Sequence, residues 1–358
     1  MKKRVLSLML AGAMVLGALT GCAGKAEETT AAATEAATEA AAEETTAETE
    51  AKTEAAEAAK ESVNIGVIQY MQHGSLDEAY NGFVDGLAEA GYVDGENITI
   101  NFQNASGDAN NCQQICDVFA NSDTDLVLAI ATPAAQSAVN VFQETEIPVL
   151  FTAVTDAVSA GLVESNEAPG KNVTGTLDMP VIADQIAVIK DVLPEASKLA
   201  ILYTSSEVNS EIQAEEAKAA AEALGMEVVI QTSSTSNDIP QVISSVVGTV
   251  DAIYIPSDNA FANAMATVNS TAVENQIPVF CAVEAMIAEG GIATTAIDYY
   301  ELGKQTAAQA VRVLNGEAAS EIAVETQKEC ALVVNKTFAE SVGVEVPAEV
   351  LDNAVTVY

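Results

Sequence analysis

The sequence predicts an α/β protein with two similar, doubly wound parallel-sheet lobes that are joined by a multi-segment hinge. From residue 64 onward, short β-branched runs alternate with patterns typical of helices, which favours right-handed βαβ units on a parallel sheet. The order of these patterns occurs twice along the chain, which indicates two similar lobes. The length of 358 residues also suits about two domains.

The first residues have the pattern of an export signal. A basic start at residues 2–4 precedes an apolar run over residues 5–19, which is too short to span a bilayer comfortably. The Leu-Thr-Gly-Cys stretch at residues 19–22 resembles a bacterial lipobox. The resemblance implies a signal peptide over residues 1–21 and a lipidated Cys22 at the start of the mature protein. An ordinary signal peptide with a chance Cys, or an uncut membrane anchor, are the alternatives.

Residues 22–61 form an expected linker, because they consist almost entirely of Ala, Glu and Thr. Without large apolar side chains, such a segment cannot bury enough surface to offset the entropy of ordering. No later stretch has about 18 uninterrupted apolar residues, so lipid at Cys22 is the expected membrane contact.

The composition excludes several classes of function. The chain has 52 Asp and Glu against 14 Lys and Arg, which argues against nucleic acid and against docking on anionic lipid through basic residues. It has one His, and Cys112 and Cys116 have neither a second Cys pair nor a His to complete a metal site. We therefore expect no cofactor and no metal, and we expect these two thiols to be buried and free.

Nine short runs predict strands, and helical patterns such as residues 75–90 and 209–224 lie between them. The runs are at residues 64–69, 98–103, 126–130, 149–153, 198–203, 227–231, 252–255, 279–282 and 292–294. Each copy has a strand, a helix that ends in Gly91 or Gly225, a second strand and a polar loop. Glycine suits a helix end because it adopts left-handed backbone geometry without strain.

The repeat sets the expected domains. Residues 62–177 with about 298–330 form lobe 1, and residues 178–297 with about 331–358 form lobe 2. Ligands bind at the carboxyl ends of strands in open parallel sheets, so a cleft between the lobes is the expected site. Closure of two lobes about short hinges is a known way to trap a small molecule.

The body resembles the bacterial ABC-transporter substrate-binding proteins, and more narrowly the group that includes tryptophan- and tyrosine-binding lipoproteins. The resemblance covers about residues 62–358 and rests on the lipoprotein start, the acidic body and four stretches. These stretches are Ile65-Gly66-Val67-Ile68-Gln69 with His73-Gly74-Ser75-Leu76-Asp77, Ala131-Thr132-Pro133-Ala134, Phe151-Thr152-Ala153-Val154-Thr155-Asp156 and Pro256-Ser257-Asp258-Asn259.

The resemblance implies a type I periplasmic-binding-protein-like fold and an extracytoplasmic, lipid-anchored monomer that serves an ABC importer. The implied partners are a small-molecule ligand and the permease and ATPase subunits. The expected ligand is an amino acid, aromatic or large and apolar. A sensor component, or a sugar- or nucleoside-binding protein of the same fold, is the alternative. An enzyme is not expected, because the chain has no nucleophile elbow, phosphate-binding loop or zinc box.

In lobe 1, the candidate ligand contacts follow the expected strands. Ser75 is an expected helix N-cap and a candidate for binding an anionic group with nearby backbone N–H groups. Thr132 is likewise an expected cap, and its hydroxyl with the N–H of Ala134 are candidates for a carboxylate. Thr155 and Asp156 are candidates for the polar head of the ligand.

In lobe 2, Ser205, Ser206 and Asn209 lie in a loop dense in hydrogen-bonding groups, for which ordinary cap chemistry is the alternative. Asp258 and Asn259 follow a later strand, and Asp258 is the favoured partner for a ligand ammonium, with a helix N-cap as the alternative. We expect Asp258→Ala to weaken amino-acid binding by tens of fold or more and to leave the fold intact.

Two further groups of candidates lie near the expected hinge and loops. Asp298 is placed to bind the ammonium or to tie the hinge. Tyr70, Phe261 and Tyr299 are the nearest aromatic residues, and Tyr70 is the one selected as a ligand contact.

Overall fold

The computed structural model describes residues 62–327 and 329–358, so the expected signal peptide, Cys22 and the linker lie outside the described residues. In the described part of the chain, each expected strand is present, and its ends differ from the expected ends by at most two residues. The strands β5, β11, β12 and β13 were not expected, and three of them are only two to four residues long.

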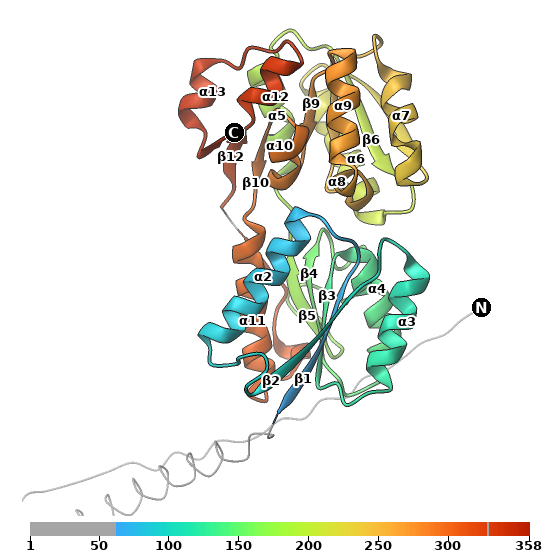
Figure 1. Ribbon diagram of the computed structural model, residues 1–358, viewed down its shortest axis with the longest axis vertical. Helices are drawn as coiled ribbons and strands as arrows, with labels where there is room; N and C mark the ends of the chain where they lie inside the picture. Colours follow the sequence, from blue (N-terminus) through green and yellow to red (C-terminus); the bar gives the residue numbers. More distant parts are fainter. Residues whose placement is uncertain (1–61, 328) are drawn as a thin grey trace, which may run out of the picture. The chain divides into compact units, whose positions relative to one another are not determined.

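The described residues of lobe 1 form a six-stranded parallel sheet in the order β11-β5-β4-β3-β1-β2 (Figure 1). The strands are β1 Val63–Gln69, β2 Ile98–Asn104, β3 Leu126–Ile130, β4 Val149–Val154, β5 Val173–Leu177 and β11 Glu325–Thr326. Helices α2 (Gly74–Glu89) and α11 (Tyr299–Leu314) cover one face, and α3 (Ala109–Ala120) and α4 (Thr132–Phe142) cover the other. Because both faces are covered, β3, β4 and β5 are buried along their whole length.

Lobe 2 has a parallel sheet in the order β7-β6-β8-β9. Its strands are β6 Lys198–Thr204, β7 Glu227–Ser233, β8 Ala252–Ile255 and β9 Val279–Cys281. The helices are α5 Ile182–Val192, α6 Val208–Ala223, α7 Ile239–Val246, α8 Asn259–Asn263, α9 Met265–Asn275, α10 Glu284–Gly290, α12 Lys336–Ser341 and α13 Ala348–Asn353, with a short 3₁₀ turn at Ser236–Asp238. A second 3₁₀ turn, Ala319–Glu321, lies in lobe 1 between α11 and β11.

The two lobes differ at the last expected strand. β10 (Ala293–Ala296) pairs antiparallel with β12 (Ala331–Val334), and β13 (Thr356–Val357) extends this small separate sheet. The chain leaves lobe 2 through β10 and returns through β12, so the two strands run in opposite directions. The sequence pattern of β10, which leads into a crossing, does not distinguish it from a strand of the parallel sheet.

Helices α2 and α11 touch backbone to backbone, although they are far apart in the sequence. A Cβ atom at Gly82 would lie 1.9 Å from the carbonyl oxygen of Tyr300, and one at Gly303 would lie 2.1 Å from that of Ala79. Only glycine fits such an approach, because Cβ atoms essentially never come within 3 Å of another heavy atom. This close packing fixes α11 to the first helix of lobe 1.

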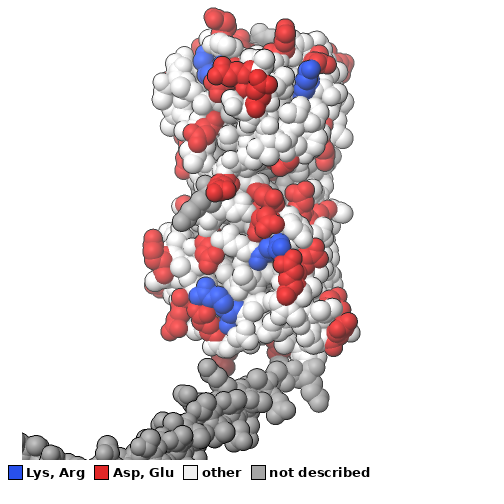
Figure 2. All heavy atoms as spheres, turned by 90° about the vertical axis from the view of Figure 1, so that its left-hand side faces the viewer, with Lys and Arg blue, Asp and Glu red and all other residues white. Residues whose placement is uncertain are grey.

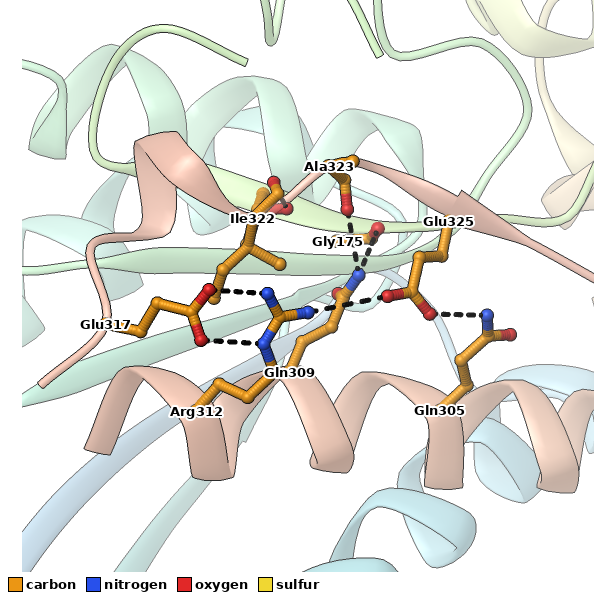
Figure 3. Close-up of polar contacts among 9 residues, drawn as sticks. Gly175, Gln305, Gln309, Arg312, Glu317, Ile322, Ala323 and Glu325 are labelled. Carbon is orange, nitrogen blue, oxygen red and sulfur yellow. Dashed lines mark hydrogen bonds and ion pairs between the residues drawn. The ribbon is translucent and has the colours of Figure 1, made fainter. Parts of the chain in front are cut away.

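The segment that follows α11 is held on α11 by polar contacts (Figure 3). Arg312 donates to both carboxylate oxygens of Glu317, at 2.8 and 2.5 Å, and lies 3.7 Å from Glu325. Gln305 donates to Glu325 at 2.8 Å. The backbone is therefore held on lobe 1 up to β11, and the crossing to lobe 2 begins only after it.

The crossings follow β5, β10 and β11 in the described part of the chain. Two of them are tied to each other by a pair of hydrogen bonds: the side chain of Gln327 accepts from the N–H of Asp298 at 3.1 Å and donates to its carbonyl at 2.6 Å. The second and third crossings are therefore joined to each other.

Candidate functional site

A small cavity lies where the carboxyl ends of both parallel sheets meet, and residues of both lobes line it. The lining residues are His73, Ser75, Leu76, Ala153, Thr155, Asp178, Asn209, Ser257, Asp258, Asn259, Ala262, Val283 and Tyr299. The cavity measures about 20 Å³, which is room for a water molecule. This is the place where ligands bind in open parallel sheets.

The cavity is surrounded by polar atoms that lack a hydrogen-bond partner. Among the described residues, eight buried side-chain polar atoms have no partner, and four of them belong to residues that line this cavity. They are Ser75 Oγ, His73 Nδ1, Asn209 Oδ1 and Ser257 Oγ. Because buried polar atoms in native proteins are nearly always paired, this concentration indicates a surface that is completed by a ligand.

The backbone of lobe 1 is strained beside the cavity. Ala131 and Ala153, at the ends of β3 and β4, have φ angles of 82° and 55°. The pairing of β4 with β5 also shifts register between Phe151 and Val154, and Ala153 lies within that irregularity. Strained residues and bulges gather at functional sites, where they redirect the chain toward a ligand.

The start of α2 supplies hydrogen-bond donors from lobe 1. Ser75 was expected to cap this helix, but the N-cap position is His73, and no side chain caps the helix. Ser75 is only 2% exposed, and its hydroxyl has no partner among the described residues. The hydroxyl is therefore available to a ligand in the cavity.

Asp258 lines the cavity from lobe 2, but its carboxylate is already occupied. It accepts from the N–H and hydroxyl of Thr204 at 2.6 and 2.9 Å, and it caps α8 by accepting from Phe261 N at 2.9 Å. Burial raises its pKa. Asp258→Ala would therefore also lower the stability of the fold, because three buried donors would lose their acceptor.

Glu207 is a second buried carboxylate of lobe 2, and it was not among the candidates. It accepts from the N–H groups of Asn259 and Ala260 and from the side-chain amides of Asn259 and Asn209, at 2.5 to 3.3 Å. Burial, together with nearby Asp258, raises the pKa of Glu207 to about 8. Asn209 and Asn259, which were expected as ligand contacts, line the cavity and are both held by Glu207.

Asp178 also lines the cavity, and it belongs to the first crossing. It is 4% exposed, and burial raises its pKa. It accepts from the hydroxyl of Tyr299 at 2.7 Å and, at the longer distance of 3.4 Å, from the hydroxyl of Thr155. With fewer donors than Asp258, its carboxylate keeps more acceptor capacity for a ligand.

Three expected contacts are buried away from this cavity. Tyr70 donates its hydroxyl to the carbonyl of Gly107 at 3.0 Å and packs in the core. Thr132 and Ala134 lie inside the first turn of α4, because strained Ala131, and not Thr132, occupies the N-cap position. None of the three lines the cavity, so their roles as ligand contacts stay predictions.

Four further expected contacts lie on the surface. Ser205 and Ser206 are exposed. Asp156 accepts from the backbone N–H groups of Val158 and Ser159, and Asp298 caps α11. Asp298 therefore has the cap role that is usual for such a residue. None of these four lines the cavity either.

Sequence reasoning missed His73, Glu207 and Asp178 as site residues. His73 and Glu207 lie in the polar loops that follow β1 and β6, and Asp178 directly follows β5. The available signal was a titratable residue at the carboxyl end of a parallel strand. Glu207 and Asp178 share another feature, since neither forms an ion pair within 4 Å among the described residues.

The two lobes touch across the cavity through polar contacts. His73 Nε2 lies 3.1 Å from Asn259 Oδ1, and Asn263 donates to the carbonyl of Gln72 at 2.8 Å. A longer contact of 3.4 Å joins Gln213 to Thr155. These contacts describe a cleft that is closed.

Among the described residues, neither the charged surface nor the thiols indicate a second binding site. Acidic side chains are spread over the face in Figure 2 with few basic ones among them. Cys112, Cys116 and Cys281 are buried and free, whereas Cys330 is free and exposed.

In residues 62–327 and 329–358, no group of three or more His, Cys, Asp or Glu is arranged for a metal ion. No helix within the same residues has the length and apolarity to cross a bilayer.

Comparisons with known proteins agree with this fold. The family model described as ABC transporter substrate binding protein matches residues 64–358. The chain is 37% identical over 334 residues to the tyrosine-binding protein of Clostridioides difficile (strain R20291), and the match covers 93% of this chain and 90% of that protein.

Two solved structures are similar as well. An ABC domain from Streptococcus pneumonia in complex with L-Trp is 36% identical, with a TM-score of 0.80 and coverage of 83% of this chain and 100% of that one. The ligand-free, open structure of a substrate-binding protein with adhesive properties from Clostridium difficile is 40% identical, with a TM-score of 0.63 and coverage of 82% and 98%. The chain belongs to the family of ABC transporter substrate-binding proteins.

Proposed function

We propose that this protein captures an aromatic amino acid between its lobes and delivers it, as a lipid-anchored monomer, to an ABC importer. Proteins of this family are extracytoplasmic, bind small molecules and work with a permease and an ATPase. The observation that carries the proposal is the set of buried, unpartnered polar atoms that both lobes direct to one cavity. The relatives named for tyrosine and L-Trp supply the amino-acid class.

The chemistry of the cavity suits a zwitterion. In lobe 1, the hydroxyl of Ser75 and the uncapped start of α2 favour a carboxylate. On the other side, Asn209 Oδ1 is a free acceptor, and the Asp178 carboxylate has acceptor capacity for an ammonium group. Both ends of an amino acid are therefore satisfied only when the lobes meet.

The arrangement of the lobes supports capture by closure. The TM-score is higher with the L-Trp complex than with the open, ligand-free structure, although the open protein is the more similar in sequence. The cavity of about 20 Å³ is also far smaller than an amino acid. A ligand therefore enters only when the lobes separate, and the cleft rearranges around it.

Calorimetric titration of the purified protein tests the ligand class. L-tryptophan and L-tyrosine should bind, while a sugar and a nucleoside should release no heat. Asp178→Asn, which keeps the size of the side chain, should weaken binding by roughly tenfold or more, since it removes a desolvated charge partner. The exposed Asp298→Asn serves as the matched control. Binding of the sugar or the nucleoside alone would contradict the proposal.

The anchor has a separate test. Cys22→Ala should release the protein from the membrane fraction, because a single lipidated residue is the proposed attachment. The readout is the distribution of the protein after a carbonate wash. A variant that stays with the membrane would show that another segment holds it.

A further inference from the structure

Glu207 does not line the cavity, yet it fixes two residues that do. It is 2% exposed, and its oxygens accept from Asn259 N at 3.1 Å, Asn259 Nδ2 at 2.5 Å, Ala260 N at 3.1 Å and Asn209 Nδ2 at 3.3 Å. Oε2 accepts from Asn259 N, from Asn259 Nδ2 and from Asn209 Nδ2, whereas Oε1 accepts from Ala260 N alone. The proton that the raised pKa of Glu207 retains therefore lies on Oε1, and the amide NH₂ groups of both asparagines face the acceptor oxygen Oε2.

The orientation of the Asn259 amide determines which of its atoms faces His73. Because the NH₂ group of Asn259 points to Glu207, its carbonyl oxygen is the atom that lies 3.1 Å from His73 Nε2 across the cleft. A carbonyl oxygen only accepts, so His73 Nε2 must carry the hydrogen. Burial lowers the pKa of His73, so the ring is neutral and its Nδ1 has no hydrogen.

Asn209 is oriented in the same way. Its NH₂ group donates to Glu207 and, at 2.8 Å, to the carbonyl of Ser257. Its Oδ1 is left as a buried acceptor with no partner in the part of the chain that the structure describes, as is Nδ1 of the neutral His73 ring. Both residues line the cavity.

We propose that Glu207 is a positioning residue that, through Asn259, holds His73 as the Nε2–H tautomer and so presents Nδ1 as an acceptor to a donor group of the ligand. The inference rests on the proposed function, in which that donor group is the ammonium of an amino acid. Asn259 and His73 belong to different lobes, so the tautomer is selected when the cleft closes. When the cleft closes, Glu207 thereby determines that His73 Nδ1 and Asn209 Oδ1 are the acceptors that face the ligand.

The chain has a single histidine, which makes the tautomer directly measurable. In the protein labelled with [¹⁵N]histidine, the two ring nitrogens give the only imidazole signals, and their shifts report which one carries the hydrogen. The samples are the parent, Glu207→Gln and the control Glu211→Gln, each with and without L-tryptophan. Glu211 is an exposed residue of the same helix, α6.

With L-tryptophan, the parent and Glu211→Gln should show a protonated Nε2 and an unprotonated Nδ1. Glu207→Gln should show averaged signals of both tautomers and bind L-tryptophan roughly tenfold more weakly, because one end of the glutamine amide cannot accept from Asn259. A protonated Nδ1 in the parent, or an unchanged spectrum in Glu207→Gln, would overturn the proposal.

Two further measurements separate a failure of this proposal from a variant that does not fold and from a parent that binds no amino acid. If Glu207→Gln does not fold by circular dichroism, Asn259→Ala, which leaves Glu207 in place, should give the averaged signals, and an unchanged spectrum would refute the relay. If calorimetry shows that the parent binds neither L-tryptophan nor L-tyrosine, the amino-acid proposal fails. The sugar or the nucleoside that binds in calorimetry then replaces L-tryptophan, and averaged signals in the parent with that ligand overturn the relay.

Discussion

The helix starts at the cleft differ between the lobes. In lobe 1, α2 follows β1 without a side-chain cap, and the hydroxyl of Ser75 has no partner among the described residues. In lobe 2, α8 follows β8, and the carboxylates of Asp258 and Glu207 accept from its first N–H groups. Of these two helix starts beside the same cavity, the one in lobe 1 is thus open and the one in lobe 2 is occupied.

This difference teaches that a polar residue at the end of a strand is available to a ligand only if its own lobe leaves it unpaired. Lobe 1 leaves donors at the cleft, while lobe 2 uses its buried carboxylates to hold its own backbone and two asparagines. The acceptors that lobe 2 offers are then Asn209 Oδ1 and Ser257 Oγ. Four measurements sharpen or break this comparison.

The largest expected effect is on stability in lobe 2. Asp258→Ala should lower the free energy of unfolding by about 3 kcal/mol, because the cap of α8 is lost and buried donors of Thr204 and Phe261 lose their acceptor. Denaturant unfolding measures it. Asp156→Ala, which removes a more exposed carboxylate that accepts from two backbone N–H groups in a turn of lobe 1, should lower it by about 1 kcal/mol or less. Equal values for the two variants would remove the distinction between the lobes.

The second effect is a pH dependence from Glu207. Its pKa is raised to about 8 in the folded protein from 4.5, so between these values the folded state holds a proton that the unfolded chain has lost. The free energy of unfolding should therefore fall as pH rises from about 4.5 to about 8, by no more than about 1.4 kcal/mol per pH unit for this group, and level off above.

Glu207→Gln should flatten this pH dependence, since a glutamine does not titrate. Glu211→Gln should keep the slope of the parent. Denaturant unfolding at several pH values provides the measurement. A slope in Glu207→Gln as steep as in the parent would assign the dependence to the other buried carboxylates, Asp178 and Asp258.

The third effect is on binding in lobe 1. Ser75→Ala should weaken binding of L-tryptophan by about tenfold and change the free energy of unfolding by less than about 0.5 kcal/mol, because the hydroxyl has no partner among the described residues. Ser206→Ala, at an exposed position of lobe 2, is the control and should leave both quantities unchanged. A loss of stability in Ser75→Ala without a loss of affinity would mean that the hydroxyl supports the fold.

The smallest effect concerns closure itself. Asn263→Ala removes one hydrogen bond between the lobes, to the carbonyl of Gln72, and should weaken L-tryptophan binding about threefold. Small-angle scattering should still show a smaller radius of gyration with saturating L-tryptophan in both parent and variant. An unchanged radius in the parent would argue against closure, and a loss of closure in the variant would make this contact the main latch.

Much of the fold follows from local patterns. The strands at β3 and β8 begin and end where the apolar runs predict, because an apolar strand between turn residues is a local feature of sequence. The sequence did not reveal that β10 pairs antiparallel with β12, because pairing direction depends on where the chain returns from the other lobe.

The site was less predictable than the fold. Five of the residues expected as ligand contacts, Ser75, Thr155, Asn209, Asp258 and Asn259, line the cavity. The sequence could not separate them from neighbours such as Ser205 in exposed positions, because both kinds of residue are polar and follow a strand. Burial and pairing, which distinguish them, depend on segments that are distant along the chain.

By itself, the sequence determined that this protein has an α/β body in which the order of strands and helices occurs twice, with a cleft at the carboxyl ends of the strands. Periodicity and turn chemistry carry that information within a few residues. Only the tertiary structure decided which polar groups are free. Glu207 caps a helix whose first residue lies 52 positions further on, and His73 meets Asn259 across 186 positions. Hydrogen bonds between such distant residues form only after the chain has folded, so no local pattern reports them.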